Sequence, residues 1–144
     1  MSDAAFEEAL RTWDRRFNPE SGLVFEVLHS PGYHTRIPDG ELVHSTRTNL
    51  HYAVALLKAG GEANERRAAE ITRRILALQD TQPVNRTYGI WSWFVEEPLA
   101  QMAPPDWNWA DFCGAALGHM LVEHAAQLPA DLLEAIRAAL GHAA

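Results

Sequence analysis

The sequence has little cysteine, no long apolar run and no excess of basic residues, and each shortage excludes a class of protein. The single cysteine, Cys113, cannot form a disulfide within the chain or build a thiolate zinc site. No run approaches the roughly 18 consecutive apolar residues of a membrane-spanning helix, so no membrane partner is expected. With 12 Lys and Arg against 19 Asp and Glu, the net charge is −7. That charge argues against binding to nucleic acid or to an anionic membrane surface.

Sequence motifs of nucleotide binding and of nucleophilic catalysis are also missing. There is no G-x-S-x-G, no P-loop and no G-x-G-x-x-G pattern. His119 and His124 are five residues apart, which is the wrong spacing for one face of a helix. His29, His34 and His44 have no carboxylate nearby at the spacing of metal ligands. The sequence therefore predicts no metal and no cofactor.

The length and composition are those of an ordered globular chain. The 144 residues, 47% hydrophobic and 22% charged, predict one domain over residues 1–144. The first ten residues are acidic and contain no apolar stretch, so no signal peptide is expected. A cytoplasmic location follows as the default expectation.

Apolar residues recur at three- and four-residue spacing and predict five helices. Their ranges are 3–17, 46–59, 62–79, 108–128 and 130–142. Gly60-Gly61 separates the second helix from the third, and Pro129 separates the fourth from the fifth. The predicted fold is all-α, with an N-terminal helix followed by two αα-hairpins.

Each predicted hairpin follows a long loop that is rich in polar and aromatic residues. The loops cover residues 22–45 and 80–110, and the first includes a short extended segment at 23–28. If the hairpins pack side by side, both loops lie at the same end of the molecule. Long ordered loops in compact domains are usually functional, so this end is the predicted functional face.

Four of the five tryptophans fall in the second loop or at its end. They are Trp91, Trp93, Trp107 and Trp109. Flat aromatic rings can hold the apolar faces of sugar rings or line an apolar ligand. The alternative is that these side chains fasten the loop to the rest of the domain.

Carboxylates in the same loop are candidates for acid–base chemistry. Glycoside hydrolysis needs a pair of them, and Glu96 and Glu97 are the predicted catalytic pair, although one could instead pair with Arg86. Asp106 is a candidate substrate contact. The alternative for Asp106 is capping of the helix that follows it.

A second group of candidates lies at the start of the helix over 46–59. His51 is predicted to move protons, while Arg47 and Asn49 are predicted to position or neutralise a substrate, together with Tyr88 from the second loop. The alternative is that Ser45 or Thr46 caps this helix and that the other side chains are solvated.

The segments N-L-H-Y-A-V-A-L-L, R-I-L-A-L-Q-D and Y-G-I-W-S-W-F resemble one repeat of the α/α toroids, above all the six-hairpin glycosidases and the toroid polysaccharide lyases. The matching positions are Leu76, Leu78, Gln79, Gly89 and Trp91. The resemblance covers residues 46–142 and implies alternating inner and outer helices, with the loop after Gln79 entering the active-site end. A complete toroid has more hairpins than two. The chain is then a piece of a larger toroid, one copy in a homo-oligomer, or a small bundle of its own.

Three functions remain open from the sequence. The first is a carbohydrate-active protein, glycoside hydrolase- or polysaccharide lyase-like, whose ligand is an oligosaccharide or another small molecule. The second is a non-catalytic helical module that packs its aromatic loops against other subunits or the rest of a toroid. The third is a site for an apolar or isoprenoid ligand.

Overall fold

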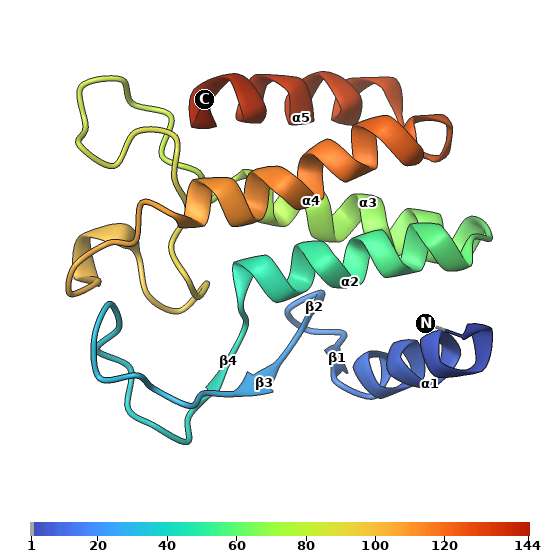
Figure 1. Cartoon of the computed structure of the whole chain (residues 1–144), viewed down its shortest axis with the longest axis horizontal. Helices are drawn as coiled ribbons and strands as arrows, with labels where there is room; N and C mark the ends of the chain where they lie inside the picture. Colours follow the sequence, from blue (N-terminus) through green and yellow to red (C-terminus); the bar gives the residue numbers. More distant parts are fainter. Residues whose placement is uncertain (1) are drawn as a thin grey trace.

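The computed structural model describes residues 2–144, and within them the fold is mostly helical, as predicted (Figure 1). The helices are α1 (Asp3–Asp14), α2 (Thr46–Ala59), α3 (Glu62–Leu76), α4 (Trp109–Glu123) and α5 (Ala130–Ala143). Short 3-10 turns, η1 (Leu99–Gln101) and η2 (Ala125–Gln127), accompany them. The four strands are β1 (Phe17–Asn18), β2 (Leu23–Val24), β3 (Glu26–Val27) and β4 (Leu42–Val43).

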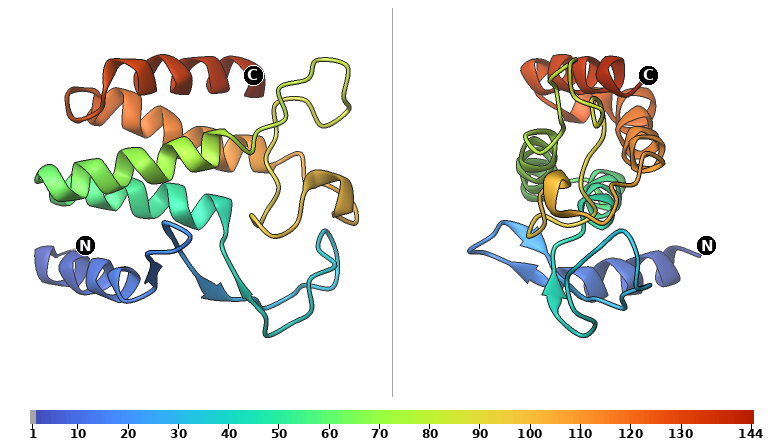
Figure 2. Two further views of the ribbon diagram at one scale, coloured as in Figure 1. Left: turned by 180° about the vertical axis from the view of Figure 1, so that it is seen from behind. Right: turned by 90° about the vertical axis from the view of Figure 1, so that its left-hand side faces the viewer.

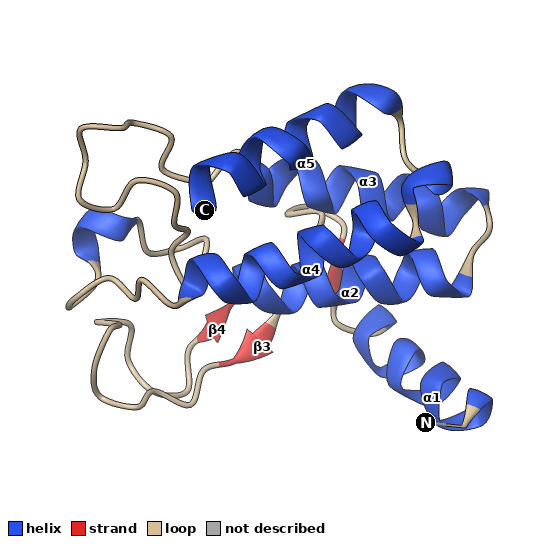
Figure 3. Cartoon of the chain, turned by 45° about the horizontal axis from the view of Figure 1, so that its top comes forward, coloured by secondary structure: helices blue, strands red, loops and turns tan. Residues whose placement is uncertain are grey.

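The strands form two short antiparallel pairs that the prediction of an all-α fold does not contain. Phe17 pairs with Val24 across β1 and β2, and Glu26 pairs with Val43 across β3 and β4. Both pairs lie on the α1 side of α2 in Figure 1, and Figure 3 shows the strands in red. The first helix therefore ends at Asp14 rather than at the predicted residue 17, because Phe17 belongs to the first strand pair.

Four of the helices surround the main core. Helix α2 packs against α3 and α4, and α5 packs against α4 and α3, as the end-on view in Figure 2 shows. The turn between α2 and α3 contains Gly60 and Gly61, both at positive φ, where glycine avoids the strain of a side chain. Fully buried side chains from all four helices meet between them, including Leu50, Leu57, Ile71, Ile75, Leu117, Met120 and Ile136.

The long loops lie together at one end of these helices. In Figure 1, residues 77–108 and the loop between β3 and β4 are at the left, where α2 and α4 begin. The short turns between α2 and α3 and between α4 and α5 lie at the opposite end. Within residues 2–144, none of the helices is both long and apolar enough to cross a membrane.

The base of the second loop is fixed by the residues that carry the toroid resemblance. Gln79 donates from Nε2 to the carbonyl oxygens of Gly89 and Ala139, each at 2.9 Å. Trp91 is fully buried, and its Nε1 donates to the carbonyl oxygen of Ile75 at 3.0 Å. The loop is thus fastened to α3 and α5 before it reaches the end of the molecule where α2 and α4 begin.

Helix α1 is fastened to the other helices through one buried hydroxyl. Tyr52 of α2 donates to Oδ1 of Asp14 at 2.6 Å and accepts from Nη1 of Arg67 at 3.1 Å. Burial of this phenol, together with its hydrogen bond to Asp14, raises the pKa of Tyr52 to about 12. The neutral hydroxyl therefore joins α1, α2 and α3 at any physiological pH.

Candidate functional site

A pocket of about 670 Å³ lies between α1, α2 and the second strand pair, and it extends to the first residue of α4. It is built from five separate stretches of the chain. Its principal side chains are Phe6, Leu10, Trp13, Glu26, Leu28, Val43, Arg47, Thr48, His51, Tyr52, Trp93, Phe94 and Trp109. Most of these side chains are apolar or aromatic, so the pocket suits a molecule with an apolar body.

Helix α1 supplies one wall of the pocket. Phe6, Leu10 and Trp13 recur at three- and four-residue spacing and form an apolar stripe along α1, and all three line the pocket. No residue of α1 is buried. Leu10 and Trp13 pack in part against the main core, and the three partly buried side chains also present apolar surface to the pocket.

Two tryptophans form the far end of the pocket. The rings of Trp93 and Trp109 lie 5.3 Å apart, centroid to centroid, at an angle of 38°. Trp93 donates from Nε1 to Oδ2 of Asp106 at 3.0 Å, and Trp109 donates from Nε1 to Oγ1 of Thr46 at 2.8 Å. Since both indole N–H groups have partners, the ring positions are set before any ligand arrives.

One carboxylate lines this apolar space. Oε1 of Glu26 is buried and has no hydrogen-bond partner, and no ion pair to Glu26 forms among the described residues. Such atoms are rare, because buried polar groups are nearly always satisfied. The side chain belongs to β3 and pairs only through its backbone, with Val43.

Two basic side chains also line the pocket. The guanidinium of Arg47 lies 4.1 Å from the ring centroid of Phe112 and 5.9 Å from that of Trp109. His51 is one turn further along α2; desolvation in the pocket and, second, the charge of Arg47 lower its pKa. The neutral imidazole is thereby favoured at His51, and the positive charge of Arg47 lies over aromatic rings.

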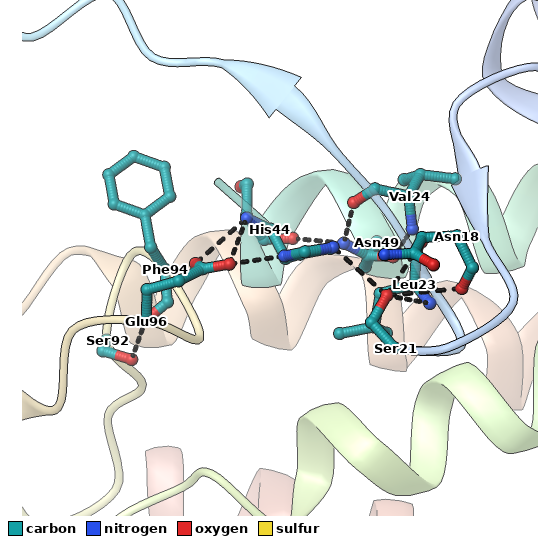
Figure 4. Close-up of polar contacts among 10 residues, drawn as sticks. Asn18, Ser21, Leu23, Val24, His44, Asn49, Ser92, Phe94 and Glu96 are labelled. Atoms are coloured by element: carbon teal, nitrogen blue, oxygen red, sulfur yellow. Dashed lines mark hydrogen bonds and ion pairs between the residues drawn. The ribbon is translucent and has the colours of Figure 1, made fainter. Parts of the chain in front are cut away.

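A serine, a histidine and a glutamate form a chain of contacts around His44, the residue directly after β4 (Figure 4). Oγ of Ser21 lies 3.1 Å from Nε2 of His44, and Nδ1 of His44 contacts Oε1 of Glu96. Both carboxylate oxygens of Glu96 also accept from the backbone N–H of His44 at 3.1 Å. This order of side chains is that of a nucleophile, a base and an orienting acid.

The surroundings of Ser21 assign this chain of contacts a structural role. The N–H of Gly22 donates to the carbonyl oxygen of Asn18, and the N–H of Leu23 donates to Ser21 itself, so neither is free to stabilise an oxyanion. Neither Ser21 nor His44 lines the pocket. The contacts join the turn between β1 and β2 to the start of α2 and to the loop at Glu96.

Three of the predicted site residues are buried and do not line the pocket. Trp91 and Asn49 are 0% exposed and Glu97 is 3% exposed. Asn49 accepts from the N–H of Val24 at 2.8 Å and donates to the carbonyl oxygen of the same residue at 3.1 Å. Glu97 accepts from the N–H of Arg36 at 2.8 Å. Asn49 holds the first loop to α2, Glu97 joins the two loops, and Trp91 holds the second loop to α3. For Trp91 this is the structural alternative that the sequence left open.

Four other predicted residues lie outside the pocket. Trp107 is 48% exposed and donates from Nε1 to the carbonyl oxygen of Arg86. The hydroxyl of Tyr88 lies 2.7 Å from Nδ1 of His142. Asp106 is buried and accepts from the N–H of Asn108 as well as from Trp93. Glu96 is the fourth, and its carboxylate contacts the imidazole of His44.

The structure brings four of the predicted site residues together: Arg47, His51, Trp93 and Trp109. It adds others that the sequence analysis does not single out, above all Trp13 and Glu26. A signal for Glu26 exists, because it is the only charged residue in the apolar run over 23–28. Among residues 2–144, no group of His, Cys, Asp or Glu is arranged to hold a metal ion.

Comparison with known proteins identifies the family. The model of DUF8769, described as a domain of unknown function, matches residues 3–144. The chain therefore belongs to this family. No curated protein and no solved structure matches it.

Proposed function

We propose that the protein binds a small molecule with an apolar body in the pocket between α1 and α2. The observation that carries this proposal is the position of Phe6, Leu10 and Trp13, whose apolar stripe faces a cavity of about 670 Å³. Ligand pockets for small molecules have volumes of roughly 300–1,000 Å³ and mostly apolar walls.

The direct test is binding of a neutral apolar probe, N-phenyl-1-naphthylamine, whose fluorescence rises in an apolar site. Ala55 lines the pocket from α2, so Ala55→Phe fills part of it and weakens probe binding. The matched control is Ala138→Phe on α5, at an exposed position outside the pocket. Equal binding by the two variants, or no binding by the unaltered protein, would overturn the proposal.

Carbohydrate binding is a proposal for the same pocket. Its support is the pair of partly exposed rings of Trp93 and Trp109, which both line the cavity with their N–H groups already bonded. Oligosaccharides titrated in the same assay test it, since bound sugar displaces the probe and quenches tryptophan fluorescence.

A second candidate function is that of a helical module in a larger assembly. Its support is twofold. Helix α2 packs beside α4 and α3 beside α5, as in two successive hairpins of a toroid. Phe112 and Val122 of α4 are also exposed, and exposed apolar residues on one helix suit an interface. The test is the mass of the protein in solution. A homo-oligomer that becomes a monomer in Val122→Asp supports the module. A monomeric unaltered protein that binds the probe contradicts it.

A further inference from the structure

We infer that the ligand of this pocket carries a protonated amine beside its apolar body, and that Glu26 receives the ammonium group. The inference rests on the proposed function and names the chemical class of the ligand. Its basis is the carboxylate of Glu26, which lines an apolar pocket and has a buried Oε1 without any donor.

The position of Glu26 explains why its carboxylate matters. Its neighbours in the run over 23–28 are all apolar, and it lies in β3, opposite the buried Val43 of β4. A carboxylate in such surroundings is unfavourable unless a donor compensates for the lost water. A ligand that supplies N–H groups at this point provides that compensation.

The basic side chains of the protein near the pocket are engaged elsewhere. The guanidinium of Arg47 lies over Phe112 at 4.1 Å, and that of Arg16 lies 5.3 Å from the ring of Trp13. The ammonium of Lys58 lies 4.5 Å from the ring of Phe6. His51 lines the pocket but favours its neutral form. In the described part of the chain no basic group pairs with Glu26, so the cation has to come from the ligand.

The aromatic walls favour the same class of ligand. Trp13, Trp93 and Trp109 surround the cavity, and the faces of aromatic rings attract cations as well as apolar groups. Arg47 opposes a cationic ligand, but its charge already faces two rings at the α4 end of the pocket. A hydrogen bond between an ammonium and a carboxylate is stronger than one between neutral groups. These interactions together favour a ligand with an ammonium head group over one with a hydroxyl or a carboxylate head group.

The experiment compares ligands that share one apolar chain and differ in the head group: decylamine, decanol and decanoate, each below its aggregation concentration at neutral pH. Dissociation constants come from displacement of N-phenyl-1-naphthylamine. Decylamine is expected to bind about tenfold or more tighter than decanol, as a charge-assisted hydrogen bond implies. Decanoate is expected to bind more weakly than decanol.

The variant Glu26→Gln keeps the shape of the side chain and removes its charge. In this variant decylamine is expected to lose its advantage in affinity over decanol, while the dissociation constant of decanol stays the same. Glu20→Gln, at an exposed carboxylate in the turn between β1 and β2, is the control and keeps the advantage. A decylamine advantage that survives in Glu26→Gln would overturn the inference.

A comparison in the unaltered protein makes the test independent of the variant. Decyltrimethylammonium has the charge of decylamine but no N–H donor, so it is expected to bind more weakly than decylamine. If decanol binds as tightly as decylamine, or decanoate binds most tightly, the inference fails while the proposed function stands. If none of the decyl compounds displaces the probe, both fail.

Discussion

Trp93 donates a hydrogen bond of 3.0 Å from Nε1 to Oδ2 of Asp106, a buried carboxylate whose Oδ1 accepts from the N–H of Asn108. One side chain thus fixes the orientation of a pocket ring and the start of α4. The sequence offered two roles for Asp106, substrate contact and capping. In the structure Asp106 lies outside the pocket and holds Trp93 and the N-cap residue Asn108, while no side chain caps α4.

Replacing Asp106 is expected to affect both the fold and the pocket. Asp106→Ala leaves the indole N–H of Trp93 without its acceptor, so the free energy of unfolding falls by about 1–3 kcal/mol and probe binding weakens. Urea denaturation and probe titration measure the two effects. Asp111→Ala, at an exposed carboxylate in the first turn of α4, is the control. If probe binding is unchanged in Asp106→Ala, Trp93 does not depend on this contact.

The contacts among Ser21, His44 and Glu96 are expected to contribute to stability. Ser21→Ala and His44→Ala should each lower the free energy of unfolding by about 1 kcal/mol, measured by urea denaturation, and leave probe binding unchanged. Thr81→Ala, at an exposed loop position, controls for loss of a hydroxyl. Covalent labelling of Ser21 by a fluorophosphonate would contradict the structural role, because only an activated serine reacts readily with such reagents.

Gly89 is expected to tolerate no side chain. Its φ is +87°, and an added Cβ would lie 2.1 Å from the carbonyl oxygen of His142 in α5. Gly40 has the same φ of +87° but nothing within 4 Å of such a Cβ. Gly40→Ala therefore measures the backbone strain alone, about 1–2 kcal/mol, and Gly89→Ala should lose at least about 2 kcal/mol more. Equal losses in thermal or urea denaturation would show that α5 does not pack on Gly89 in this way.

The stability of the protein is expected to depend on pH through His51. Desolvation and the charge of Arg47 lower the pKa of this residue below its ordinary value of 6.5. Below that value the unfolded chain binds more protons at this site than the folded chain, so the free energy of unfolding falls as the pH falls.

The measurement is urea denaturation of the unaltered protein and of His51→Gln at about pH 7.5 and about pH 5.5. The unaltered protein should lose more stability on acidification than His51→Gln does. The two proteins differ only at residue 51, so the difference between the two losses isolates His51. An equal loss in both would mean that the pKa of His51 is not lowered.

Local sequence signals predicted much of the helical framework. The start and end of α2, from Thr46 to Ala59, match the prediction because Ser45 caps the first turn and Gly60 ends the last. Helix α3 was predicted three residues too long, since Leu78 and Gln79 leave the helix to anchor the second loop. The short strand pairs were missed as pairs, because two-residue strands carry almost no periodic signal.

The site was predicted less well than the helices. Arg47, His51, Trp93 and Trp109 do line the pocket. Trp91 is also a tryptophan of the second loop, and Asn49 lies in α2 between Arg47 and His51, but both are fully buried. A tryptophan that stacks on a ligand and one that fills a core look alike in a sequence, because both are aromatic residues in a loop.

The sequence by itself determined the helices and the turns that separate them, because capping residues, glycine and apolar spacing act within a few neighbouring residues. Only the tertiary structure decided that the apolar stripe of α1 lines a pocket beside α2. It also decided that Glu26 lines the same pocket, with Oε1 lacking a hydrogen-bond partner. The physical reason is that a pocket is made by side chains far apart in the chain. The hydroxyl of Tyr52, which joins Asp14 of α1 to Arg67 of α3, holds its walls in place.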